Sequence, residues 1–568
     1  MSGSTRIVLL ALGLFGWLML AGQSGAEAPA DTTAKRIPFH FRGSLSLGGE
    51  LYGIEGRDNR RSPWSYYAQG RLQLGVGKFS MPISFAYRDR QFSYDYTFNR
   101  IGLSPTLGIA TLHLGWRNMS FSPYTFSGRT FYGIGTEIKP GNFYVGALYG
   151  EIQNPLAIRD SLVTGASLIP IFDRKLYGAK VGFRSGANHL ELMAMKIWDD
   201  ESSFDYPDDY DLQGYNVLTP KENVVLGVNT GFGIGQVFDF AVKTGFSGFT
   251  NDLTDPLTGV INGSVPDQIE ELYTVNTSSR LSFAGDATLN LRIKATRLGV
   301  QYRRVEPFYT TLATNFFAND LEQYTFNLTT AAFKRKLRLN GRLGIERNNL
   351  REYRSNDTER IIGRLQLAYK PTPNWNFGLN YSNYQTSAET RILSLNDTLR
   401  FVSVSNQAGF TASWLRRGQS RDLNLSLYTN YQNIDDQSAV ERLTDLTAYS
   451  AALSAAWRFK HSELSIGPNI HYNRYLASNR TQERWGLGLT VAKPLIGDRL
   501  LGQFSSSISQ NDIDGLRDGL TGIHSLRFRL RVGEKGQISW YNSYRHVDSV
   551  IRSAFNEWRS SLRYGLRF

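Results

Sequence analysis

Residues 337–345 read LRLNGRLGI, a stretch in which apolar and charged or polar side chains alternate. In an extended chain the leucines and the isoleucine share one face, and the two arginines and the asparagine share the other. A strand with leucine on one face and arginine on the other is typical of a transmembrane β-barrel, whose strands contact lipid outside and water inside. This stretch therefore predicts a membrane-spanning strand.

The same alternation recurs in residues 281–293, 375–381, 423–431 and 526–531. Soluble antiparallel sheets also alternate, because one face is buried and the other is hydrated. Here the pattern continues to the last residue without a helical period, in strands longer than the usual five or six residues. Aromatic residues also gather near the strand ends, where a barrel meets the two membrane interfaces. We therefore predict an all-β protein with a single large, closed, antiparallel transmembrane β-barrel.

Short and long connections take turns along the chain, as in bacterial outer-membrane barrels with short periplasmic turns and long extracellular loops. Counting between the connections predicts about 26 strands, with a range of 24–26, and both chain ends in the periplasm. The strand over residues 94–103 is the weakest of these, and a short turn is expected around Pro105. The long polar connections are residues 153–173, 199–221, 249–278, 305–320 and 386–396.

The first residues predict export from the cytoplasm. Arg6 precedes an apolar core over residues 7–20, and the small residues 24–26 (SGA) follow it. This order is typical of a secretory signal peptide, with cleavage after Ala26. We predict a signal peptide over 1–26, a short periplasmic segment over 27–42 and a barrel over 43–568. The 16 residues of the segment leave no room for a separate plug domain.

The last strand ends on an aromatic residue. Its alternating apolar face resembles the C-terminal signal that the outer-membrane assembly machinery reads, although Phe568 would also suit an ordinary interfacial position. The residues of this predicted assembly signal are Trp558, Leu562, Tyr564, Leu566 and Phe568.

The lumen-facing positions are rich in arginine. The alternation predicts that the following side chains line the lumen: Arg71, Arg292, Arg297, Arg303, Arg338, Arg342, Arg364, Arg527, Arg529, Arg531, Arg559, Arg563 and Arg567. Rings of arginine favour anions in pores. Arginines also line barrel walls to pair with carboxylates, so both interpretations remain open.

A barrel of 26 strands has a backbone diameter of about 50 Å from the strand spacing and tilt. An empty pore of that width would abolish the permeability barrier, so something must narrow it. We expect loops 199–221 and 249–278 to do this, and residues 266–273 could form one or two helical turns. A mobile surface loop is the alternative for the second of them.

Several other chemistries are disfavoured. The chain has no cysteine, which excludes thiol catalysis, disulfides and cysteine-bound zinc. The adjacent pairs His461-Ser462 and His524-Ser525 face opposite sides of their strands, so we expect no enzyme and no cofactor. The net charge of +13 is spread over strands, which argues against nucleic-acid binding. Carboxylates that make a weak calcium candidate are Asp199, Asp205, Asp208, Asp209 and Asp211, although a solvated acidic loop is the simpler interpretation.

Residues 85–105, 112–128 and 302–326 resemble segments of uncharacterised porin-like outer-membrane barrels of Bacteroidota. The resemblance implies the fold and an outer-membrane location, and it implies no substrate or catalytic residue. The expected function is a channel for passive transport of polar solutes, with anions as the finer expectation. A scaffold closed by partners, which anchors or exports surface material, is the alternative. Expected partners are the lipid bilayer and lipopolysaccharide, the assembly machinery, and a plugging or surface protein.

Overall fold

The computed structural model describes residues 39–89, 100–153, 171–203, 219–256, 273–314, 318–352, 359–388, 401–436, 445–551 and 553–568. Residues 40–568 form one compact unit. The predicted signal peptide lies outside the described residues and stays a prediction. No helix in the described ranges combines the length and the apolarity that a bilayer crossing requires.

The described chain consists almost entirely of strands, and its one helical element is the short 3-10 helix η1 (Glu201–Ser203). The first strands are β1 (Phe39–Glu55), β2 (Trp64–Val76), β3 (Phe79–Arg88), β4 (Arg100–Leu103), β5 (Thr106–Leu107), β6 (Ala110–Arg117), β7 (Phe131–Ile138), β8 (Phe143–Gln153) and β9 (Asp173–Ser185). They are followed by β10 (Asn188–Asp200), β11 (Glu222–Ile234), β12 (Phe238–Thr250), β13 (Ser279–Ile293), β14 (Thr296–Val305), β15 (Leu321–Ala332), β16 (Leu337–Asn348), β17 (Glu359–Tyr369) and β18 (Trp375–Ala388). The last strands are β19 (Phe401–Arg417), β20 (Arg421–Asp436), β21 (Leu446–Phe459), β22 (Ser465–Ala477), β23 (Arg480–Ile496), β24 (Leu500–Ile513), β25 (Leu516–Val532), β26 (Gly536–Val547) and β27 (Phe555–Arg567).

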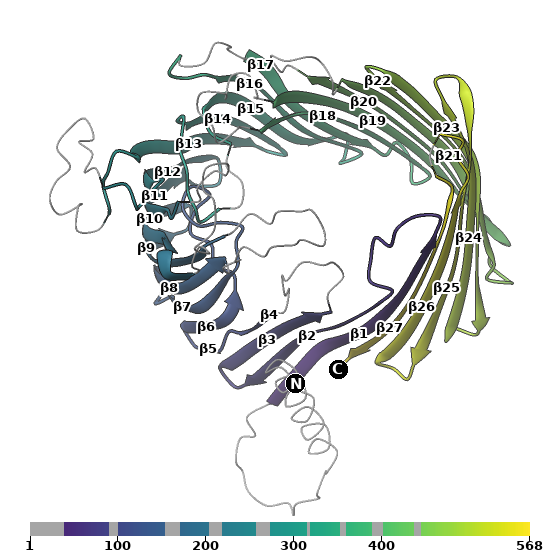
Figure 1. The fold of residues 1–568 in the computed structure, drawn as a ribbon, viewed down its shortest axis with the longest axis horizontal. Coiled ribbons are helices and arrows are strands. Elements are labelled where there is room, and N and C mark those ends of the chain that lie inside the picture. Colours follow the sequence, from purple (N-terminus) through teal and green to yellow (C-terminus); the bar gives the residue numbers. More distant parts are fainter. Residues whose placement is uncertain are drawn as a thin grey trace, which may run out of the picture. The chain divides into compact units, whose positions relative to one another are not determined.

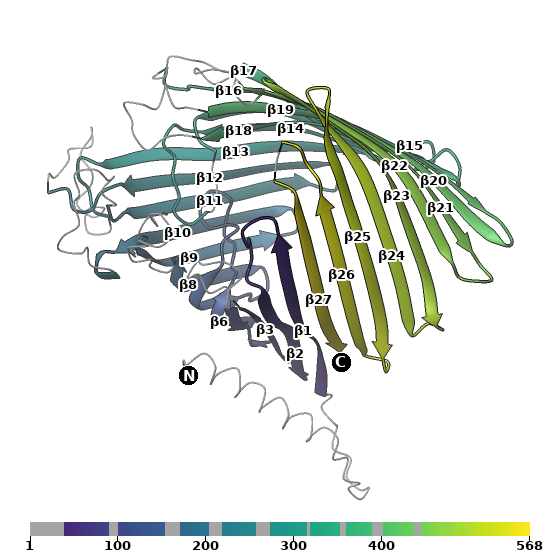
Figure 2. The ribbon, with the colours of Figure 1, turned by 45° about the vertical axis from the view of Figure 1, so that its right-hand side comes forward.

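Consecutive strands pair antiparallel around the ring, and the last strand returns to the first (Figure 1). β1 and β27 pair without a break from Ser44↔Arg567 to Glu55↔Asn556, and Figure 2 shows them side by side. Because β4 and β5 both lie between β3 and β6, they fill one position in the ring. The structure is therefore a closed antiparallel barrel of 26 strands, which confirms the predicted fold class and strand count.

For the strand predicted over residues 94–103, the end of the strand and the position of the turn were wrong. The turn was expected around Pro105, but Pro105 instead separates β4 from β5, and the turn lies at Gly108 and Ile109. Proline has no backbone N–H to donate to a neighbouring strand, which explains the break. Residues 90–99 lie outside the described ranges.

The alternation of the sequence becomes an apolar outside and a polar inside. Leu453, Ile470, Leu487 and Ile508 stand opposite one another on four neighbouring strands, and each is more than half exposed. The next row around the same strands is polar and includes Ser454. An outward apolar band with a polar interior is the pattern of a transmembrane barrel.

The seam between the two ends of the chain is held by backbone and ring contacts. Gly43 N donates to the Phe568 carbonyl oxygen over 2.8 Å, and Phe568 N donates back over 3.1 Å. The rings of Phe41 and Phe568 stack with centroids 4.7 Å apart. β1 begins at Phe39, four residues before the expected start. Phe41, which the earlier start adds to the strand, and Gly43 both contact Phe568, so the pairing of the two ends includes the last residue.

The two faces of β21 give the first testable prediction. Leu453→Arg places a charge in lipid at the middle of a spanning strand, which should cost about 2–4 kcal/mol of folding free energy. Ser454→Arg is the matched control because its side chain reaches the lumen, and it should be far milder. Urea titration of the protein in vesicles, followed by gel mobility, measures both. Equal losses for the two variants would contradict the assignment of faces.

Candidate functional site

Residues 118–130, between β6 and β7, carry an apolar segment into the interior of the barrel. Met119, Phe121 and Phe126 are at most 4% exposed and belong to one buried cluster. The cluster also contains inward-facing side chains of β10, including Met193 and Met195. A connection that buries its aromatic residues against the inner wall fills that part of the lumen.

A second segment, residues 306–314 after β14, locks the first in place. Tyr309 Oη donates to the Tyr124 carbonyl oxygen over 2.6 Å, and Thr311 Oγ1 donates to the Thr125 carbonyl oxygen over 3.0 Å. Tyr309 is 1% exposed and packs with Tyr124 in a second buried cluster. The two connections therefore form one unit, called here the lumen insert (residues 118–130 and 306–314).

Two glycines of the barrel wall make room for the lumen insert. Gly227 on β11 and Gly245 on β12 stand directly opposite each other on the inner face. A β-carbon at Gly245 would lie 2.7 Å from the Tyr124 β-carbon, and one at Gly227 would lie 2.5 Å from Thr125 Cγ2. Any larger residue at Gly245 would therefore push the insert away from the wall.

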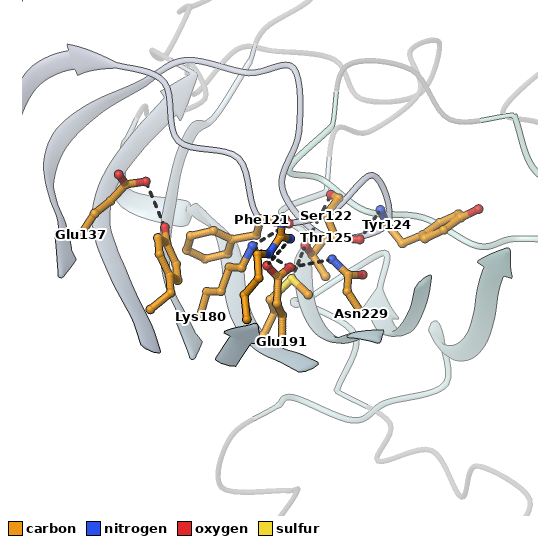
Figure 3. Close-up of polar contacts among 11 residues, drawn as sticks. Phe121, Ser122, Tyr124, Thr125, Glu137, Lys180, Glu191 and Asn229 are labelled. Atoms are coloured by element: carbon orange, nitrogen blue, oxygen red, sulfur yellow. Dashed lines mark hydrogen bonds and ion pairs between the residues drawn. The ribbon is translucent and has the colours of Figure 1, made fainter. Parts of the chain in front are cut away.

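Polar side chains of the barrel wall also hold residues 118–130 in place, and Figure 3 shows the contact that Lys180 makes with this segment. Lys180 Nζ donates to the Phe121 carbonyl oxygen over 3.3 Å and lies 2.9 Å from Glu191 Oε2 on the neighbouring strand. At the other end of the segment, Tyr124 Oη donates to Asp286 Oδ1 over 2.8 Å. Burial, and then the Asp286 carboxylate, raise the pKa of Tyr124, so its phenol stays a neutral donor at physiological pH.

The lumen insert is not one of the loops expected to narrow the pore. Most of 199–221 and 249–278, including residues 204–218 and 257–272, lies outside the described ranges. Of the second loop, Tyr273 is described, and it packs beside Gly248. Gly248 stands opposite Leu281, which is 57% exposed, so this end of the loop lies on the outward face. Whether the rest of these loops enters the lumen stays a prediction.

Where the barrel closes, the inner wall is cationic instead of apolar. A cavity of about 1450 Å³ lies against the inner wall of β25, β26, β27, β1, β2, β3, β4 and β6. It also contacts the lumen insert at Asn118 and Thr130, and we call it the seam cavity. Its cationic side chains are Arg71, Arg100, Arg117, Arg527, Arg529, Arg531, Arg563, Arg567 and Lys535. Glu534 is the one acid among the described residues that line it.

The arginines of the seam cavity contact neutral groups. Arg563 Nε donates to Ser46 Oγ over 2.8 Å, and Arg117 donates to Ser84 Oγ over 3.0 Å. The Arg527 guanidinium lies 5.1 Å from the centre of the Tyr541 ring. Within the described part of the chain, none of the eight arginines pairs with a carboxylate. Within the described residues, these charges therefore have no carboxylate partner.

Six of the thirteen predicted arginines lie in the seam cavity, and the others are dispersed. The dispersed ones are Arg559, 2.6 Å from Glu50; Arg297, 3.3 Å from Asp239; Arg292, opposite Arg297; Arg303, opposite Asp286; Arg342, opposite Arg364; and Arg338, opposite Ala331. Arg100 and Arg117 were not among the predicted residues. Arg117 ends the alternating strand β6, which is the signal that would have found it.

The acidic loop offers little support for a metal site. Asp199 accepts from Arg174 Nε over 2.6 Å, so that carboxylate already has a cationic partner. Asp205, Asp208, Asp209 and Asp211 lie outside the described ranges. No group of three or more metal-ligating side chains occurs among the described residues.

Three histidines meet serines that are distant in the sequence. Ser104 Oγ lies 2.9 Å from His113 Nδ1, and Ser509 Oγ lies 3.0 Å from His471 Nε2. Ser506 Oγ lies 2.9 Å from His524 Nδ1. The adjacent pairs in the sequence do not reveal these contacts, because none of the contacts joins neighbouring residues of the chain. That the protein is not an enzyme stays a prediction.

No family model and no curated protein matches the chain. Among solved structures, it is similar to OccK11 (OpdR) of Pseudomonas aeruginosa, with 10% identity over 93% of this chain and 96% of that one and a TM-score of 0.33. The P pilus usher (PapC) translocation pore shows 9% identity over 93% and 99%, with a TM-score of 0.35. The siderophore receptor PirA from Pseudomonas aeruginosa shows 11% identity over 95% and 81%, with a TM-score of 0.37. The description of this chain as an outer-membrane-type β-barrel rests on its own strand pairing and apolar outer band.

The position of the lumen insert is tested by filling one wall glycine. Gly245→Val should displace residues 118–130 and cost about 1–3 kcal/mol through overpacking. The displaced segment should then be cleaved by trypsin after Arg117 and Arg129, which the wild-type protein should resist. Gly467→Val is the control, because a β-carbon there would have no atom closer than 3.6 Å. Rapid cleavage of the wild type at these two sites would contradict the placement of the insert.

Proposed function

We propose that the protein is an outer-membrane channel for passive transport of polar solutes, with a preference for anions. The observation that carries this proposal is the seam cavity, where eight arginines surround a water-accessible volume and pair with no carboxylate among the residues that the structure describes. Positive charge along one wall raises the local concentration of anions and repels cations.

The division of the lumen supports the same proposal. The lumen insert covers the inner wall of β8 to β14, where apolar side chains would otherwise contact water. A solute that enters the barrel is thereby directed away from this wall. The cationic seam cavity then lies in the remaining space, so the path that stays open is also the charged one.

The alternative of a scaffold closed by a partner protein is weakened. That alternative was motivated by the width of an empty barrel, and the lumen insert already occupies part of that width. Within this proposal the signal peptide, the assembly signal on β27, the contacts with lipopolysaccharide and the resemblance to Bacteroidota barrels stay predictions.

The test is the reversal potential of single channels in a planar bilayer under a potassium chloride gradient. The wild-type protein should reverse at a potential that shows preference for chloride. Arg527→Gln with Arg529→Gln should move the reversal potential toward zero, because two positive charges leave the seam cavity.

Arg297→Gln is the matched control for this test, because Arg297 also belongs to the inner face but lies 3.3 Å from Asp239. Its loss should leave the anion preference unchanged or raise cation passage only slightly. A cation-preferring or silent wild-type protein, shown to be inserted and rich in strand, would refute the proposal.

A further inference from the structure

The inner wall of β18 to β22 has a chemistry of its own. Asn376, Ser413, Ser426, Ser454 and Asn469 stand opposite one another across these five strands. Between the rows of Asp422 and Asp436, the inward positions of these strands carry no aspartate, glutamate, lysine or arginine in the described ranges. The one histidine there, His471 on β22, lies 3.0 Å from Ser509 Oγ. Most of the other described inward positions carry serine, threonine, asparagine, glutamine, glycine or alanine, and the larger side chains among them include Leu415, Ile434, Leu446, Tyr428 and Tyr475. We call this surface the neutral wall.

The groups of the neutral wall are both donors and acceptors of hydrogen bonds. Gln407 Nε2 donates to Asn430 Oδ1 over 3.0 Å, and the hydroxyls of Ser426 and Ser454 lie 2.6 Å apart. Each amide and hydroxyl keeps further donor or acceptor capacity after such a contact. A dense set of neutral amides and hydroxyls matches solutes that present many hydroxyl groups.

Two tyrosines project inward from the same wall. Tyr428 on β20 is 43% exposed and Tyr475 on β22 is 40% exposed, and both have inward partners across their strands. A tyrosine combines a flat apolar face with a polar tip. Such a side chain can cover the carbon-bound hydrogens of a sugar ring while its hydroxyl meets the ring's oxygens.

The neutral wall runs into the seam cavity through β23 and β24. Ser505 stands opposite Ser525, and the next inward pair, farther from the turn at Asp514 and Gly515, is Gln503 and Arg527. A small inorganic anion needs the arginines alone, whereas a neutral sugar needs the neutral wall alone. A solute that uses both surfaces must carry hydroxyl groups and an anionic group together.

We propose that the solutes of this channel are anionic carbohydrates, which are sugar rings or short chains of rings that carry a carboxylate or a phosphate. The guanidinium groups of the seam cavity bind the anionic group, and paired N–H donors suit both carboxylate and phosphate. The neutral wall exchanges hydrogen bonds with the sugar hydroxyls, and Tyr428 and Tyr475 lie against the rings. This inference rests on the proposed channel function and adds the class of solute.

The experiment is blockade of single-channel current by added solutes, recorded after the reversal potential in potassium chloride alone. The probes are trigalacturonate, the neutral trisaccharide maltotriose, tricarballylate, which has three carboxylates and no hydroxyl, and glucose 6-phosphate. A tenfold change in affinity corresponds to about 1.4 kcal/mol, which two additional hydrogen bonds of modest strength supply. Trigalacturonate should therefore half-block the current at about a tenfold lower concentration than either maltotriose or tricarballylate.

Variants assign the effect to the two surfaces. Tyr428→Leu with Tyr475→Leu should remove most of the advantage of trigalacturonate over tricarballylate and leave the chloride preference intact. Arg527→Gln with Arg529→Gln should remove its advantage over maltotriose. Tyr431→Leu, a tyrosine of the same strand on the outward face, is the control and should change neither. Glucose 6-phosphate tests phosphate as the anionic group, and absence of blockade by it would overturn the phosphate part of the solute class.

The outcomes separate this inference from the proposed function. Equal blockade by trigalacturonate and tricarballylate in an anion-preferring channel would overturn the inference and leave the channel proposal standing. Equal blockade by trigalacturonate and maltotriose would overturn the anionic part of the solute class. If the wild-type protein shows no preference for chloride in potassium chloride alone, the proposal of an anion-preferring channel is itself overturned.

Discussion

The structure depends on one constraint, which is that a backbone inside a bilayer finds no water to satisfy its N–H and C=O groups. A sheet can therefore cross the membrane only if its two edges pair with each other. Here that pairing is the unbroken ladder between β1 and β27, from Ser44↔Arg567 to Glu55↔Asn556. Closing 26 strands in this way removes every exposed edge, and it also encloses a wide interior.

The width of that interior explains the remaining features. A polar wall facing a broad water-filled space would make an unselective pore, and the chain avoids this on one side by folding its own connections inward. Where the lumen insert covers them, the inner faces of β8 to β14 bury apolar side chains and hold the insert through polar anchors such as Lys180 and Asp286, and they carry glycine where it approaches most closely. The inner faces at the seam are instead cationic, and those of β18 to β22 are neutral. Three walls of different chemistry thus surround one space.

Much of the fold could be predicted because the alternation has a period of two and is local. Leu453 and Ser454 reveal their faces without knowledge of any distant residue. The strand broken at Pro105 was harder, because its two pieces are recognisable as one strand only through their shared neighbours β3 and β6. The strand count survived this error because the up-and-down order requires a strand at that position.

The site was harder to predict than the fold. The expected narrowing loops are two of the long polar connections, whereas the first segment of the lumen insert, residues 118–130, is short and aromatic. Its second segment, residues 306–314, lies within the long connection 305–320, which was not expected to narrow the pore. The available signal was β10, which is apolar on its inward face at Met193, Met195 and Ile197 as well as on its outward face. The gathering of Arg71 with Arg527 and Arg563 could not be read from spacing, because only barrel closure brings the two ends of the chain together.

The most direct test of this account uses the absence of cysteine from the chain. Single cysteines at Ser539, which lines the seam cavity, and at Ser247, which is 1% exposed beneath the lumen insert, can be labelled without background. The account predicts that a membrane-impermeant anionic thiosulfonate modifies Ser539→Cys faster than its cationic counterpart, relative to their rates with a free thiol. It also predicts that Ser247→Cys resists both reagents. Equal rates for both reagents at Ser539→Cys, or rapid labelling of Ser247→Cys, would contradict a lumen that is filled on one side and cationic on the other.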